Sequence, residues 1–249
     1  MEHQWIDLTV ETVESEHLCC AIADKKHQAG VQSKKQWLKQ RFEEGHVFRK
    51  LDARGKVLIE YAPLETAWVP IEGDNYVYIY CLWVAGSFKG QGLAKELLES
   101  CIADAKAKHK AGVCVLSSKK KKPYLSDAKF FKRFGFEVAD TAPNDFELLA
   151  LSFDGSMPRF VSTAKAFEIG EKDLTIYHGM QCPFLVNSIE QVRSYCETNA
   201  IPLRLVAIDS LEKAKALPFV PANYAVFQNG KFVTHQLLNE NLFKKKLGL

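Results

Sequence analysis

The chain has 249 residues, 47% of them hydrophobic and 25% charged, so it can bury a large core and is not intrinsically disordered. A net charge of +3 does not indicate nucleic acid binding, and no apolar run of about 18 residues predicts a transmembrane helix. The seven cysteines form no Cys-x-x-Cys pair, and the N-terminal residues lack a signal-peptide pattern. We therefore expect reduced thiols, a cytoplasmic location, no metal site, and neither a membrane nor a nucleic acid partner.

The first half alternates strand-like and helical segments. Residues 5–10 predict a short strand, and residues 16–44 have a helical composition in which Gly30 is the expected break. Further along, the pattern predicts strands at residues 47–51, 57–61 and 76–84, followed by an amphipathic helix from residue 93. A strand at 113–116, a helical turn or two at 127–134 and a strand at 146–153 are predicted after it. This order is that of an α/β domain.

The second half begins after Asp154-Gly155-Ser156-Met157-Pro158, which predicts a boundary. We expect domains at residues 1–156 and 157–249. The elements predicted beyond it are strand 174–177, helix 185–199, strand 203–208, helix 211–217, strand 224–227, an Asn229-Gly230 turn, strand 231–235 and a final helix. The order β-α-β-α-β-β-α is that of a thioredoxin-like domain.

The most informative segment runs from Leu82 to Ala94. A strand ends at Val84, glycines occupy positions 90 and 92, and an amphipathic helix follows. Glycines let the main chain approach an anion, and the first N–H groups of a helix have no partner within the helix. Together with the helix dipole they form a phosphate site. The alternative is a plain turn between a strand and a helix.

This segment resembles motif A of the GNAT superfamily of N-acetyltransferases, Arg/Gln-x-x-Gly-x-Gly/Ala, with Val84 at the family's distance before the basic position. The resemblance implies a mixed central sheet flanked by helices and acetyl-CoA as the co-substrate. It also implies that the main chain of Leu82 and Val84 binds the pantetheine arm. The amides implied to bind the pyrophosphate are those of Lys89, Gly90, Gln91, Gly92, Leu93 and Ala94.

A second resemblance covers residues 127–136, which are similar to the closing helix and Gly-Phe turn of GNAT motif B. Many members carry there a tyrosine that protonates the departing thiolate, where this chain has Phe131. Tyr124, which stands where members often have an asparagine, is a substitute acid to test. The lysines at 119–122 either meet the 3′-phosphate of CoA or an acidic substrate, or form a solvated basic loop.

Direct transfer to an amine requires a proton acceptor and a donor for the developing oxyanion, for which the Val84 amide is the candidate. Glu60 and Glu65 are candidate bases, and the simpler interpretation of each is an exposed carboxylate at a strand end. Of Tyr80 and Cys81, strict alternation turns one toward the cleft and the other toward the core. The acids of the loop 63–75 would suit a cationic amine.

The second half resembles a bacterial subgroup of these enzymes that carries a C-terminal YoaP-like domain; residues 117–127 and 177–184 carry that resemblance. Cys182 stands where glutaredoxins have the first cysteine of Cys-Pro-Tyr-Cys, Leu185 replaces the second, and Pro221 occupies the place of that fold's cis-proline. Cys182 is either a nucleophilic or substrate-positioning thiol or a packing residue.

The leading hypothesis is an acetyl-CoA-dependent N-acetyltransferase that acts on a small amine, with a C-terminal domain that shapes the acceptor site or a homodimer. One alternative is a thiol-dependent redox protein that uses Cys182 and senses acyl-CoA through its N-terminal half. Another is a non-catalytic acyl-CoA-binding module.

Overall fold

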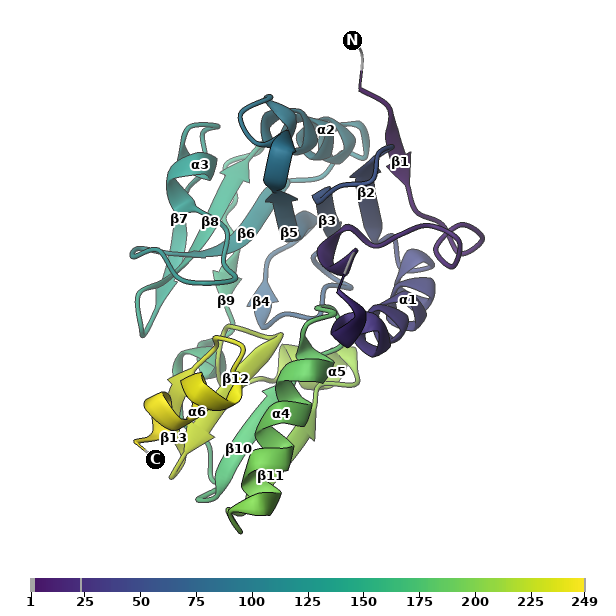
Figure 1. The fold of residues 1–249 in the computed structure, drawn as a ribbon. Coiled ribbons are helices and arrows are strands. Elements are labelled where there is room, and N and C mark those ends of the chain that lie inside the picture. The colour runs from purple at the N-terminus through teal and green to yellow at the C-terminus, as the bar shows by residue number, and fades with distance from the viewer. Residues whose placement is uncertain (1–2, 23, 249) are drawn as a thin grey trace. The chain divides into compact units, whose positions relative to one another are not determined.

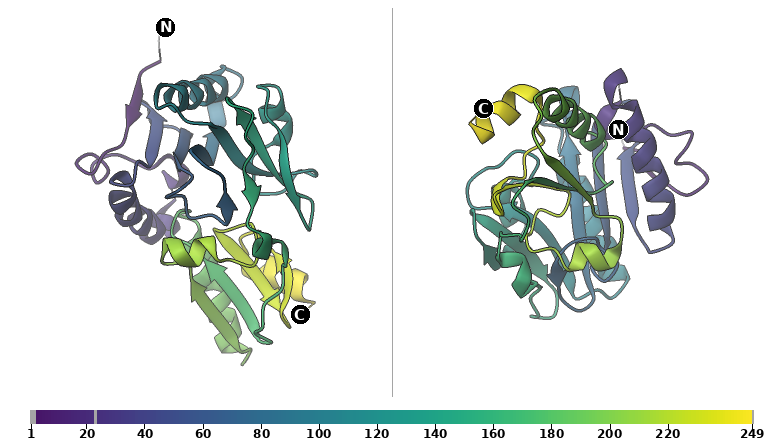
Figure 2. Two further views of the ribbon diagram at one scale, coloured as in Figure 1. Left: turned by 180° about the vertical axis from the view of Figure 1, so that it is seen from behind. Right: turned by 90° about the horizontal axis from the view of Figure 1, so that it is seen from below.

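The computed structural model describes residues 3–22 and 24–248, and the chain forms two compact units (Figures 1 and 2). The first consists of residues 1–22, 38–67 and 71–160, and the second of residues 23–37, 68–70 and 161–249. The predicted domain limits, 1–156 and 157–249, remain a prediction. Among the described residues, no helix is long and apolar enough to cross a membrane.

The first unit contains a seven-stranded sheet of order β1-β2-β3-β5-β6-β8-β7. Its strands are β1 (Trp5–Asp7), β2 (Val47–Leu51), β3 (Val57–Pro63), β5 (Tyr76–Val84), β6 (Gly112–Ser118), β7 (Glu137–Ala142) and β8 (Phe146–Ser152). β5 and β6 pair in parallel through the crossover helix α2 (Leu93–Ala107), and the other neighbours are antiparallel. A short helix, α3 (Ala128–Lys132), precedes β7, and a small ribbon joins β4 (Ile71–Glu72) to β9 (Arg159–Phe160). The predicted mixed central sheet flanked by helices is confirmed.

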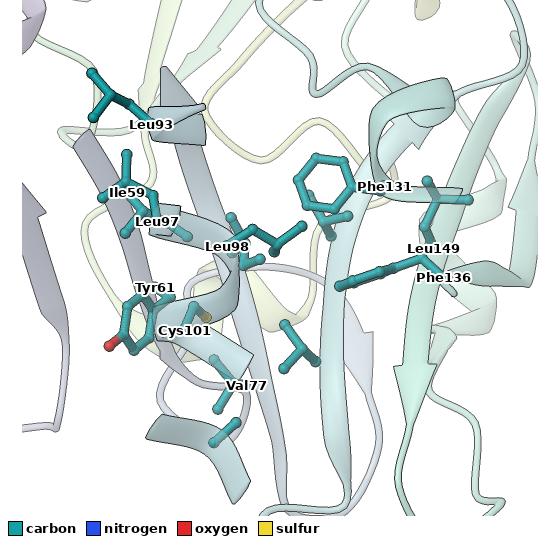
Figure 3. Packing of buried hydrophobic residues seen from close by; sticks show 14 of the residues in the cluster. Ile59, Tyr61, Val77, Leu93, Leu97, Leu98, Cys101, Phe131, Phe136 and Leu149 are labelled. Atoms are coloured by element: carbon teal, nitrogen blue, oxygen red, sulfur yellow. The ribbon is translucent and has the colours of Figure 1, made fainter. Parts of the chain in front are cut away.

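Helix α2 covers one face of this sheet because its apolar residues recur every three or four positions. Leu93, Leu97, Leu98, Cys101 and Ala105 are all buried. They pack against a set of aliphatic and aromatic side chains from β3, β5, β6, α3 and β8, shown in part in Figure 3. The face of the sheet that carries Ile59 and Val77 is therefore filled by the hydrophobic core and has no room for a ligand.

The second unit contains a four-stranded sheet of order β11-β10-β12-β13. Its elements are β10 (Leu174–His178), α4 (Leu185–Thr198), β11 (Leu203–Ala207), α5 (Leu211–Lys215), β12 (Tyr224–Gln228), β13 (Lys231–Thr234) and α6 (Glu240–Leu247). They follow one another in the predicted order, and Asn229 and Gly230 form the predicted turn with φ of 53° and 76°. Every described peptide bond is trans, so the bond before Pro221 is not the cis bond that its position suggested.

The expected helix break at Gly30 is wrong. Helix α1 (Gln28–Phe42) continues through this residue, and the chain before it forms only short 3-10 turns at Cys19–Ala21 and Lys25–His27. A Cβ atom at position 30 would overlap the carbonyl oxygen of Pro183. The glycine therefore serves a close approach of two backbones within the second unit, next to a contact of 4.7 Å between the ring centroids of His27 and Phe184.

This contact predicts an effect opposite to helix propensity. Alanine normally stabilises a helix interior by about 1 kcal/mol relative to glycine. Gly30→Ala should instead lower the free energy of unfolding by about 1–3 kcal/mol, because the added methyl group overpacks the contact with Pro183. Urea denaturation followed by circular dichroism measures the change. Gln32→Ala, at an exposed position of the same helix, should stay within about 0.5 kcal/mol of the wild type. Stabilisation by Gly30→Ala would contradict the assignment.

Candidate functional site

The loop between β5 and α2 is shaped by glycines in the left-handed region. Gly86, Gly90 and Gly92 have φ of 66°, 80° and 82°, values that side chains rarely adopt. A Cβ atom at any of the three would meet no other atom within 4 Å. The turn thus needs glycine for its backbone conformation, while the space beside it is open to a ligand.

The same loop presents main-chain donors at the start of α2. The N–H groups of Lys95 and Glu96 donate to the carbonyl of Gly92 at 2.8 and 3.2 Å, and that of Lys89 donates to Gly86 at 3.3 Å. In the described part of the chain, no hydrogen bond is made by the amides of Gly90, Gln91, Gly92, Leu93 and Ala94. These amides converge at the positive end of a 15-residue helix, which is the arrangement that binds phosphate groups. Lys89, by contrast, uses its amide within the turn.

Beside this loop, β5 separates from β6. Their pairing covers Tyr76 to Ile79 on β5, and the rest of β5 pairs with β3 alone. The amide of Ala85 donates to Lys56 at 2.9 Å, and Val57 lies opposite Val84. Because successive main-chain groups of a strand point to opposite sides, those of Leu82 and Val84 are directed away from β3, toward the side that β6 has left. A linear polar chain could pair with them there.

A one-residue bulge at Tyr80 lies where the two strands separate. Glu60 pairs with Cys81 and Tyr61 with Ile79, so Tyr80 is the extra residue of β5. The Tyr80 ring lies 5.0 Å from that of Tyr78 and 5.1 Å from that of His46. The expected alternation of Tyr80 and Cys81 is therefore wrong, because the bulge places both side chains on the face that carries Glu60.

Glu60 is the buried carboxyl group of this face. It is fully buried, and its Oε1 lies 3.0 Å from Nε2 of His46, whose side chain is 2% exposed. The interpretation of Glu60 as an exposed strand-end carboxylate is wrong, because it occupies the middle of β3. His46 was not predicted from the sequence: it follows the turn at Gly45, and no motif marks it.

The other acidic candidates are already engaged. Glu65 accepts a hydrogen bond from the amide of Asn75 at 2.8 Å and lies 3.7 Å from Nζ of Lys110, which fits the exposed-carboxylate alternative. Glu72 accepts a hydrogen bond of 2.6 Å from Arg159. These partners neutralise much of the charge that was expected to attract a cationic amine.

The remaining predicted groups lie away from this face or are occupied. Tyr124 is 64% exposed in the loop before α3, with φ of 62°, and its role stays a prediction. Phe131 is 1% exposed and packs edge-on against Phe130 and Phe136, as a member of the core (Figure 3). Of the basic loop, Lys120 lies 3.3 Å from Asp145, Lys122 is half-buried with Nζ 5.3 Å from the centroid of the Phe146 ring, and Lys119 and Lys121 are exposed.

In the second unit, Cys182 is partly buried at the end of the loop that follows β10. Its carbonyl accepts a hydrogen bond of 3.2 Å from the amide of Leu185, at the start of α4, and its side chain packs against the core of this unit. The neighbouring Gln181 accepts a hydrogen bond of 2.6 Å from Asn223. The reactivity of this thiol stays a prediction.

The described residues contain no cluster of three or more His, Cys, Asp or Glu side chains that could hold a metal ion.

Comparison with known proteins decides the family. Residues 10–136 match the model of the acetyltransferase (GNAT) family, and residues 202–245 match the YoaP-like family. Over 245 residues, 98% of both chains, the protein is 43% identical to the uncharacterized N-acetyltransferase YoaP of Bacillus subtilis (strain 168). The chain belongs to the GNAT acetyltransferase family. This GNAT protein is accordingly an acyltransferase, and the predicted resemblance to the GNAT family with a YoaP-like domain is confirmed.

Two solved structures similar to this GNAT acetyltransferase align with under two thirds of its chain. The PaiA N-acetyltransferase of Thermoplasma acidophilum, in complex with coenzyme A, is 16% identical and aligns with 61% of this chain and 100% of its own, at a TM-score of 0.44. The GNAT-family N-acetyltransferase YhbS of Escherichia coli, in complex with CoA, is 18% identical and aligns with 64% and 89% of the two chains, at a TM-score of 0.42.

The cradle predicts a charge-specific effect at Gly92. Gly92→Glu and Gly92→Gln impose the same strain at a φ of 82°, but only the first places a carboxylate beside the open amides. We expect Gly92→Glu to bind CoA at least about tenfold more weakly than Gly92→Gln, a difference of about 1.4 kcal/mol. Isothermal titration measures both affinities without an acceptor. The gap should narrow at high salt, because salt screens charge repulsion at an exposed site. Equal affinities would contradict the site assignment.

Proposed function

We propose that this GNAT acetyltransferase transfers the acetyl group of acetyl-CoA to the nitrogen of a small-molecule amine by direct attack on the thioester. The observation that carries the proposal is the proximity of two features on consecutive residues. The glycine cradle with open amides begins directly after the stretch of β5 that has lost its pairing with β6. We also propose a cytoplasmic setting, because the seven cysteines are expected to be reduced thiols, and a homodimer as the assembly.

The residues present fit acetyl-CoA as co-substrate. The five open amides at the start of α2 suit a pyrophosphate, and the main-chain groups of Leu82 and Val84 suit the amide groups of a pantetheine arm. An arm bound along β5 places its thioester end toward the bulge at Tyr80. The exposed lysines after β6 remain a candidate contact for the 3′-phosphate.

The chemistry requires the acceptor to lose a proton before it attacks. An alkylamine with a pKa near that of lysine, about 10.4, is protonated at neutral pH. We propose Glu60 as the proton-accepting carboxylate, reached through the partly exposed end of β5, where Cys81 lies directly opposite it. The nitrogen lone pair then forms the N–C bond, the Val84 amide stabilises the oxyanion, and the C–S bond breaks to release the thiolate. The excess proton left on the nitrogen passes to water, which gives the neutral amide.

This chain has no phenol at the position from which many family members protonate that thiolate. Phe131 cannot donate a proton and is closed into the core. A thiolate with a pKa of about 8.5 is a tolerable leaving group without a donor. Cys81 and Tyr124 remain the proposed donors, and Cys81 is the one whose position beside Glu60 supports it.

For the second unit we propose a thioredoxin-like architecture. The support is the strand order β11-β10-β12-β13, in which β10 and β11 are parallel and β12 and β13 antiparallel to their neighbours. Leu185 at the start of α4 excludes a Cys-x-x-Cys dithiol cycle there, so this unit does not itself favour the redox alternative.

The proposal predicts turnover in a direct assay. Acetyl-CoA is incubated with a panel of small mono-, di- and aromatic amines, and CoA and acetylated product are quantified by chromatography, since thiol reagents would also react with protein cysteines. Cys182→Ser should retain kcat within about twofold, because the cysteine has no part in the acyl transfer. Loss of turnover in Cys182→Ser would favour the thiol alternative. Absence of acetylated product across the panel, with CoA still bound, would favour a non-catalytic acyl-CoA-binding module.

A second prediction concerns the proton acceptor. Glu60→Gln keeps an oxygen that accepts the hydrogen bond from His46 but cannot take up a proton. We expect kcat to fall by about 10²–10⁴, the usual contribution of general base catalysis, with little change in the KM for acetyl-CoA. Glu65→Gln, at a partly exposed carboxylate, is the matched control and should retain activity. Similar activities for the two variants would remove Glu60 from the mechanism.

A further inference from the structure

We infer that His46 is a positioning residue for acetyl transfer: it fixes the buried Glu60 carboxylate and the Tyr80 ring at the point where β5 loses its pairing with β6. The inference rests on the proposed function, in which Glu60 accepts the amine proton. It goes beyond that function because His46 lies outside the sequence motifs, on the segment that joins α1 to β2.

The local structure directs His46 inward. Gly45 takes a φ of 84°, which turns the chain at the end of α1, and the amide of His46 donates to the carbonyl of Arg41 at 3.2 Å. The imidazole then enters the sheet face opposite α2 and is almost fully buried. Because the tight turn at Gly45 fixes the backbone, the imidazole ring can approach β3 from one direction only.

The proposed function sets the direction of the hydrogen bond between the two side chains, because it requires Glu60 to be ionised. An ionised carboxylate only accepts, so Nε2 of His46 carries the proton and donates to Oε1 of Glu60 across 3.0 Å. Taking a carboxylate out of water costs several kcal/mol unless hydrogen bonds replace its hydration. His46 supplies such a bond at the site where Glu60 must stay ionised to accept a proton.

The same imidazole also contacts the bulge residue of β5, Tyr80. Its ring centroid lies 5.1 Å from that of Tyr80, and the two ring planes are inclined by 43°. Tyr80 is the bulge residue, so its position depends on the side chains that pack against it. His46 therefore touches both the proton acceptor and the residue at which β5 leaves its regular register.

Titratable and charged groups also lie on the neighbouring strands and near the end of α1, and they must be considered in any pH experiment. Lys50 on β2 is paired with Glu16 at 2.7 Å, and Arg41 is paired with Glu44 at 3.1 Å. On β5, burial raises the pKa of Tyr78 far above its ordinary value, so it stays neutral throughout the working range. The groups concerned are Glu16, Arg41, Glu44, Lys50, Tyr78, Tyr80 and Cys81.

The test compares two replacements of His46. His46→Gln retains an N–H donor near the position of Nε2, whereas His46→Leu fills similar space without one. We expect His46→Leu to lower kcat at least about tenfold, to change the KM for acetyl-CoA less than about twofold, and to displace the acid limb of the pH profile of kcat/KM by about one unit. His46→Gln should recover most of the kcat. Loss of folding alone would not give this split between kcat and KM.

A double-variant cycle separates positioning from simple packing. In the Glu60→Gln background, His46→Leu should cause no further loss of kcat, because the group it positions is already inactive. This background also removes the buried charge that could prevent His46→Leu from folding. Equal losses in both backgrounds, or an unchanged pH profile in His46→Leu, would overturn the inference while leaving the proposed function intact. Absence of turnover in the wild type would overturn both.

Discussion

One extra residue in β5 lies at the point where this strand loses its pairing with β6. Tyr80 has no partner position in β3, and from that point β5 continues without β6. A regular sheet would close every main-chain group into the ladder and would divide neighbouring side chains between the two faces. The bulge does neither. It leaves the main chain of Leu82 and Val84 directed away from β3, on the side where β6 no longer pairs, and it gathers Tyr80 and Cys81 beside Glu60.

The buried pair of His46 and Glu60 is hard to explain as a source of stability. Replacement of a buried ion pair by apolar residues of similar volume is often neutral or stabilising, because desolvation offsets the attraction between the charges. The surrounding face carries aromatic and aliphatic side chains such as Phe48, Leu58 and Tyr78, together with the buried Lys50, which is paired with Glu16. A carboxyl group and an imidazole retained at a buried site are better accounted for by what they do to a ligand than by what they add to the core.

Much of the fold was predictable because its core elements have strong periodic patterns. The face of α2 and the long apolar strand β5 repeat at helical and strand spacing, and the cradle carries glycines that the turn requires. β7 was missed because it is a largely exposed edge strand without regular apolar alternation. Gly30 was misjudged because two different structures both require glycine: a break in a helix, and a close approach to a backbone that is distant in sequence. Here it is the approach to Pro183. His46 and the bulge depend on register, which a single sequence does not display.

The way the chain is shared between the two units limits how this enzyme can be divided. Residues 23–37 and 68–70 belong to the second unit although they are encoded inside the first. Truncation after residue 160 would leave the start of α1 without Pro183 and Phe184, which pack against Gly30 and His27. A single cut after residue 160 therefore separates the second unit from the segments 23–37 and 68–70 that belong to it. Either fragment expressed alone would carry an incomplete unit, so the enzyme is best produced and studied as one uninterrupted chain.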